Sequence, residues 1–130
     1  MKRSKLIPWF IIFLSFCFYG DAQNISGLKG VKRILLVYES PADSNFYLNQ
    51  KTVEKNNLAG FKERDLEVIK IKNPWLLKKY GIGIKKSVVL LIGKDGFEKV
   101  RRFLIFSSNE LFRIIDAMPM RKDEIKNQRD

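Results

Sequence analysis

Two adjacent segments decide the fold: SVVLLIGKDGFEKV at residues 87–100 and LFRIIDAMPMR at residues 111–121. The first begins with a continuous apolar run, which predicts a strand buried on both faces. Asp95-Gly96 favours a tight hairpin turn, because glycine tolerates the positive φ that such a turn requires. Basic residues after the turn predict a second strand at 97–103 with one wet face, as at a sheet edge. Apolar residues at i, i+3, i+4 and i+7 from Leu111 predict a closing helix that packs one stripe on the sheet.

The segments before this block alternate between strand and helix patterns. Ser44 is the expected N-cap of a helix that stops near Gly60, with a charged turn after it. Asn73 and Pro74 predict the start of a short helix, because proline suits the first helical position. The expected strands are residues 33–38, 66–72, 87–92 and 97–103, and the expected helices are residues 44–60, 74–80 and a third after Ser107. This βαβαββα order predicts an α/β fold, a four-stranded mixed sheet with helices on both faces.

The N-terminal segment has the layout of a secretory signal peptide. A positive start is followed by an apolar stretch at residues 6–19 and by small residues up to Ala22. We expect cleavage after Ala22 and export to the periplasm or the extracellular space; the alternative is an uncleaved anchor. Cys17 lies inside the apolar stretch, where it serves as one more apolar residue. The expected organisation is a signal peptide at 1–22, a lead-in at 23–32, a domain at 33–120 and a charged tail at 121–130.

The chain is strongly basic, with a formal net charge of +11 over 130 residues. Removal of residues 1–22 leaves 22 of the 25 basic residues and 13 of the 14 acidic ones, a net charge of +9. One interpretation is simple solubility, and the other is attraction to an anionic partner. Nucleic acid is not an expected partner of an exported protein, and no stable membrane span is expected after cleavage.

Three motifs carry a resemblance to a known family. The segments LIGKDG at 91–96, LFRIIDAMPMR at 111–121 and ERDL at 63–66 resemble the domain-of-unknown-function 4174 family. That family is thioredoxin-like, is found in exported bacterial proteins, and is similar to modules of sushi-repeat and equarin-type extracellular proteins. The resemblance implies a thioredoxin-like fold. It supplies no active site, because the family has no established catalytic residues.

The chain departs from working thioredoxins at their redox site. Those proteins carry a Cys-x-x-Cys motif at the start of the helix after the first strand, where the helix dipole lowers a thiol pKa. Here that loop is degenerate and consists of Glu39, Ser40, Pro41, Ala42 and Asp43. Lys85-Lys86-Ser87 stands where thioredoxins place a cis-proline. We therefore expect no thiol–disulfide exchange.

Two other sets of residues are candidates for a function. Glu39 and Asp43 flank the degenerate loop and are a possible acid–base pair for a hydrolase- or transferase-type enzyme; the competing interpretation is stabilisation of a helix start. Trp75, with Lys78 and Lys79, is a candidate binding site, against the alternative that Trp75 packs in the core. Residues 23–130 contain no histidine and no cysteine, and we expect no metal and no cofactor.

The sequence thus predicts an exported, non-catalytic thioredoxin-like module that acts by binding. The expected partner is another envelope protein or an anionic surface glycan.

Overall fold

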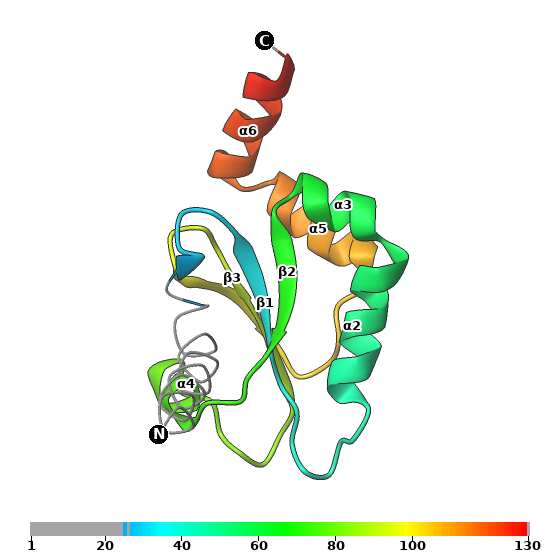
Figure 1. Ribbon diagram of the computed structural model, residues 1–130, viewed down its shortest axis with the longest axis vertical. Coiled ribbons are helices and arrows are strands. Elements are labelled where there is room, and N and C mark those ends of the chain that lie inside the picture. Colours follow the sequence, from blue (N-terminus) through cyan, green and yellow to red (C-terminus); the bar gives the residue numbers. More distant parts are fainter. Residues whose placement is uncertain (1–24, 26, 130) are drawn as a thin grey trace, which may run out of the picture.

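The computed structural model describes Ile25 and residues 27–129 (Figure 1). The elements, in chain order, are β1 (Arg33–Tyr38), α2 (Phe46–Asn56), α3 (Leu58–Glu63), β2 (Leu66–Lys70), α4 (Pro74–Lys79), β3 (Val88–Ile92), β4 (Glu98–Arg102), α5 (Ser108–Asp116) and α6 (Pro119–Arg129). None of the helices in this part of the chain has the length and apolar character needed to cross a membrane. The expected signal peptide and Cys17 lie outside the described residues.

The four strands form one mixed sheet in the order β2-β1-β3-β4. β1 and β2 are parallel, with Leu35 opposite Val68, as a strand–helix–strand crossover requires. β3 runs antiparallel to both β1 and β4, and its pairing with β4 is irregular between Leu91 and Ile92. The α/β fold class with a four-stranded mixed sheet is therefore confirmed.

Each face of the sheet carries its own apolar cluster, because successive strand residues point to opposite faces. Leu35, Val37 and Leu91 face α2, α3 and α5, while Leu36 and Leu90 face α4 and the lead-in segment. Figure 1 shows α2, α3 and α5 on one side of the sheet and α4 on the other. Both clusters, with the side chains packed against them, are built from residues between Ile25 and Met118. Within the described residues, both cores thus lie inside the part of the chain that follows the expected signal peptide.

The expected helix over residues 44–60 is wrong at both ends. Its N-cap is Asn45, and after a break at Asn57 the chain continues as α3 beyond Gly60. Gly60 allows the Phe112 ring of α5 to pack closely against α3, because a Cβ at this position would lie 2.5 Å from Cζ of Phe112. Phe61, expected in a charged turn, is buried in the core beneath that ring.

Most of the expected charged tail at 121–130 belongs to a helix, α6, which spans Pro119–Arg129. Pro119 begins this helix, as proline favours the first helical position. Arg121 is buried, with 1% of its surface exposed. The helix therefore docks on the domain through charged side chains, although its sequence shows little apolar periodicity.

Candidate functional site

The loop at residues 39–43, which we expected to be a degenerate redox loop, lies between the end of β1 and the start of α2. Oε1 of Glu39 accepts a hydrogen bond from the backbone N–H of Tyr47 at 3.0 Å, and Nζ of Lys70 donates to Oε2 at 3.3 Å. The bond from Tyr47 is the main reason why the pKa of Glu39 lies below its ordinary value, and Lys70 adds to it. A carboxylate held in this way stays ionised and satisfies the first turn of α2. This geometry agrees with the helix-start interpretation of Glu39.

The remaining residues of the loop are held by backbone contacts. Ser40 is buried, and its N–H donates to Oγ of Ser87 at 2.9 Å, which joins the loop to the start of β3. Pro41, Ala42 and Asp43 are exposed, and the carbonyl of Asp43 accepts a bond from the N–H of Phe46 at 3.3 Å. The Ser87 hydroxyl and the Glu39 carboxylate thus hold this loop within the fold.

α4 presents Trp75 to solvent. Oδ1 of Asn73 accepts a hydrogen bond from the N–H of Trp75 at 2.9 Å, the cap that the sequence predicts. Leu76 and Leu77 pack against the cluster on this face of the sheet. Trp75 points away and is 62% exposed, so the core-packing alternative is wrong. Nζ of Lys79 lies 5.4 Å from the centre of the indole ring.

The loop after α4 lines a groove that the sequence analysis did not predict. The groove is open, has a volume of about 490 Å³, and is lined by residues 81–86 with Val88, Arg101 and Phe103. Ile84 and Phe103 are 66% and 59% exposed, and Nζ of Lys86 lies 5.6 Å from the Phe103 ring centre. Oη of Tyr38 donates to the carbonyl of Ile84 at 2.8 Å, which fixes the loop on β1. We call the side chains of α4 and this groove the basic surface: Trp75, Lys78, Lys79, Ile84, Lys85, Lys86 and Phe103.

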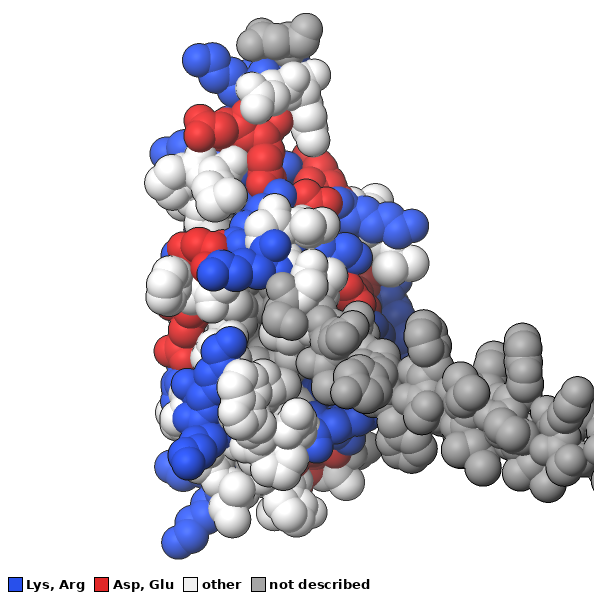
Figure 2. Space-filling view, turned by 60° about the vertical axis from the view of Figure 1, so that its left-hand side comes forward, with Lys and Arg blue, Asp and Glu red and all other residues white. Residues whose placement is uncertain are grey.

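Apart from Phe103, the residues of the basic surface lie within a run of the chain that has no acidic residue. Residues 68–94 contain seven lysines and neither aspartate nor glutamate. Lys70 pairs with Glu39, and Lys94 pairs with Glu124. Within the described part of the chain, the other five form no ion pair: Lys72, Lys78, Lys79, Lys85 and Lys86. Figure 2 shows basic side chains beside a broad uncharged area in the lower part of the molecule, where α4 lies.

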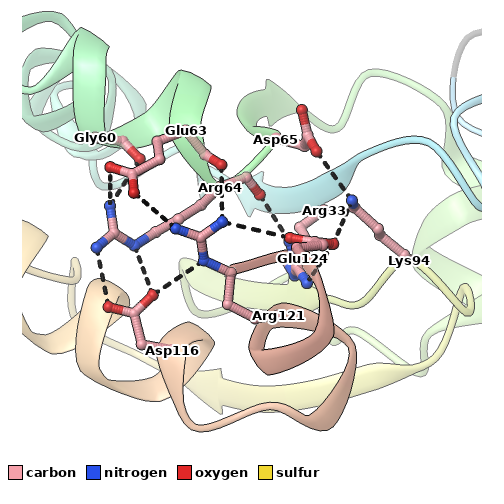
Figure 3. A network of polar contacts seen from close by, with 9 residues as sticks. All are labelled: Arg33, Gly60, Glu63, Arg64, Asp65, Lys94, Asp116, Arg121 and Glu124. Atoms are coloured by element: carbon pink, nitrogen blue, oxygen red, sulfur yellow. Dashed lines mark hydrogen bonds and ion pairs between the residues drawn. The ribbon is translucent and has the colours of Figure 1, made fainter. Parts of the chain in front are cut away.

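Charges of both signs meet at the opposite end of the sheet (Figure 3). The Arg33 guanidinium donates to both oxygens of Glu124, at 3.2 and 3.1 Å, and Nζ of Lys94 donates to the same carboxylate at 2.5 Å. Arg121 pairs with Glu63 and with Asp116. Burial raises the pKa of Glu124, but the bonds from Lys94 and Arg33 outweigh it and hold the pKa below its ordinary value. This network anchors α6, and the three cations in it, Arg33, Lys94 and Arg121, each have a carboxylate partner, in contrast to the lysines of the basic surface.

Comparison with family models gives one match, to the domain of unknown function 4174, over residues 24–124. The chain belongs to this family. Its predicted family membership and thioredoxin-like fold are thus confirmed. No curated protein gives a significant match.

Solved structures similar to this family member are thioredoxin-like. Reduced 2-Cys peroxiredoxin of Plasmodium vivax is 17% identical over 75% of this chain and 83% of its own, with a TM-score of 0.56. Thioredoxin-2 of a malaria parasite is 22% identical over 67% and 84%, with a TM-score of 0.49. The exposed lipoprotein thioredoxin of Streptococcus pneumoniae is 15% identical over 72% and 90%, with a TM-score of 0.44. At these identities the likeness concerns the fold alone.

The 4174-family chain has the four-stranded mixed sheet of a thioredoxin-like fold. Its single cysteine is Cys17, outside the described residues, and the loop at 39–43 contains none. Within the described residues, no three Asp, Glu, His or Cys side chains gather into a possible metal site. The basic surface is therefore the feature on which a functional proposal can be built.

Proposed function

We propose that this protein is an exported, non-catalytic thioredoxin-like module that binds an anionic partner of the cell envelope through its basic surface. One observation carries the proposal. Lys78, Lys79, Lys85 and Lys86 form no ion pair within the described residues, and they stand near exposed Trp75 and Ile84 in a run of the chain that has no acidic residue. Unpaired cations on a surface attract anions and raise association rates.

The non-catalytic part of the proposal is supported by the contacts of the Glu39 carboxylate, which is bound by other groups of the fold. Glu39, the best candidate for a general acid, has a lowered pKa and is bound by Tyr47 and Lys70. A general acid at neutral pH requires the opposite shift. The enzyme alternative based on Glu39 and Asp43 therefore has less support than binding.

The binding test compares two variants of equal net charge in residues 23–130. The first replaces Lys78, Lys79, Lys85 and Lys86 by glutamine, and the matched control replaces Lys55, Lys62, Lys122 and Lys126, which are exposed on α2, α3 and α6. Dextran sulfate and polyphosphate serve as soluble anionic probes. Exposed ion pairs contribute roughly 0.2–1 kcal/mol each, so the first variant should lose about 2 kcal/mol, roughly thirtyfold in affinity. Equal losses in both variants would mean that only net charge matters, and the proposal would be wrong.

The export part has a separate test. N-terminal sequencing of the protein from the envelope fraction should find Gln23 first. A chain that stays in the cytoplasm, or that keeps residues 1–22, would contradict export with cleavage after Ala22.

A further inference from the structure

Exposed apolar side chains gather beside the unpaired lysines. Ile84 and Phe103 line the same groove, with 66% and 59% of their surfaces exposed, and Leu104 next in the chain is 69% exposed. Single exposed apolar residues are ordinary on protein surfaces. A group of exposed apolar side chains bordered by cations is typical of a surface that binds a membrane or another protein.

The lining of the groove decides between a sugar polymer and a lipid surface. Apart from Ser87, which is buried against the loop at 39–43, residues 81–88 carry glycine, isoleucine, valine and lysine side chains only. Arg101 is already bonded to Glu98 and to the carbonyl of Gly81. Apart from its two lysines and Arg101, the groove has no side-chain hydroxyl, amide or carboxylate that would hold a sugar ring in a fixed position. Ammonium groups around apolar side chains match an anionic bilayer, whose headgroups lie above hydrocarbon.

We propose that the basic surface docks peripherally on an anionic phospholipid bilayer. Ile84, Phe103 and Leu104 enter the interfacial layer, and the lysines reach the lipid phosphates through their flexible stems. Trp75 lies at headgroup level, where indole rings are favoured. This inference rests on the proposed function, because it names the anionic partner of the same surface.

The test uses residues 23–130 with vesicles of phosphatidylcholine, alone or mixed with phosphatidylglycerol, in a co-sedimentation assay. Binding should require phosphatidylglycerol and weaken with salt. Each lysine near such a surface contributes roughly fivefold in binding, so Lys85→Gln with Lys86→Gln should lower the partition coefficient about 25-fold. The control, Lys122→Gln with Lys126→Gln on α6, should change it little.

A second pair of variants tests the apolar contribution. Ile84→Ser with Leu104→Ser should lower partitioning at least about tenfold, because burial of each side chain in the interface is lost. Leu48→Ser with Leu58→Ser, at positions 58% and 51% exposed on α2 and α3, is the matched control. Circular dichroism and thermal unfolding establish that all variants fold.

Trp75 supplies an independent readout, since it is the only tryptophan in residues 23–130. Its emission should shift to shorter wavelength on anionic vesicles and be quenched by brominated lipid. An unshifted spectrum in the bound state overturns the proposed orientation, and equal effects of the test and control variants overturn docking by this surface.

The two proposals fail differently. A protein that binds dextran sulfate through the four lysines but ignores anionic vesicles keeps its proposed function and overturns the membrane inference, with a soluble or glycan polyanion as the partner. A protein that binds neither probe overturns both.

Discussion

Truncation of Glu124 to alanine tests the idea that charged residues, rather than apolar ones, hold α6 on the domain. The Glu124 carboxylate accepts bonds from Arg33 and Lys94 and lies 3.5 Å from Nη1 of Arg121. Arg121 and Lys94 each have another carboxylate partner, Glu63 and Asp65 among them. Arg33, with 1% of its side chain exposed, would keep a single partner among the described residues, the carbonyl of Arg64.

The expected loss of stability follows from this arrangement. Breaking a buried ion pair by removal of one partner costs about 3–5 kcal/mol, because the other charge stays buried without compensation. The Glu124 side chain is 22% exposed, so water can reach part of the vacated site, and the lower limit applies. We therefore expect a loss of about 3 kcal/mol, which lowers Tm by roughly 12 to 24 °C in a domain of this size.

The assay is urea unfolding of residues 23–130 followed by circular dichroism. Lys122→Ala is the control on the same helix, because its side chain is exposed, and such surface changes stay within about 0.5 kcal/mol. Combining Arg33→Met with Glu124→Ala should recover most of the loss, since no unpaired charge then remains at Arg33. The reasoning is refuted if Glu124→Ala costs less than about 1 kcal/mol, or if the double variant is no more stable than the single one.

Three further predictions concern packing, capping and pH. Gly60→Ala should cost about 1–3 kcal/mol in urea unfolding, because the new Cβ forces the Phe112 ring to move; a neutral result would mean that the ring has another position. Asn73→Ala should cost about 1 kcal/mol through loss of the cap on α4, whereas Asn73→Ser should retain most of it. Glu124 has a lowered folded pKa, so its contribution to stability is complete above the unfolded value near 4.5 and is lost as pH falls through the folded pKa. Unfolding measured across this acid range should depend less steeply on pH in Glu124→Gln than in the unmodified chain.

The strands and two of the helices could be predicted because their causes are local. Apolar runs bounded by turn residues marked the strands, and side-chain caps at Asn73 and Ser107 marked the starts of α4 and α5. The prediction that the helix stops near Gly60 is wrong because the reason for a glycine at this position is a contact with a residue far away in the chain. A glycine ends helices often, and only the fold shows that it makes room for Phe112.

The sequence could not predict α6 for a related reason. A helix that is polar all round has no periodicity to find. Its buried anchor, Arg121, is bound by Glu63, which lies 58 residues earlier in the chain. The candidate site also has one part that local sequence predicts and one part that depends on long-range contacts. Trp75 was a candidate from its neighbours, whereas the groove requires Phe103 to lie beside the loop at residues 81–86, which depends on the pairing of β3 with β4.

The distribution of charge connects the two ends of the sheet. Near α6, Arg33, Arg121 and Lys94 meet carboxylates, so a large part of the positive charge at that end is neutralised. The lysines of the basic surface have no such partners within the described residues and contribute their full charge. A basic protein with this asymmetry approaches an anionic surface with one end first, since charges act over about a Debye length, ~8 Å at physiological ionic strength. The end that arrives first is the end that exposes Ile84, Phe103 and Leu104. Electrostatic steering and apolar contact therefore favour the same orientation, and this explains why we expect the lysine and apolar variants to weaken one binding mode rather than two.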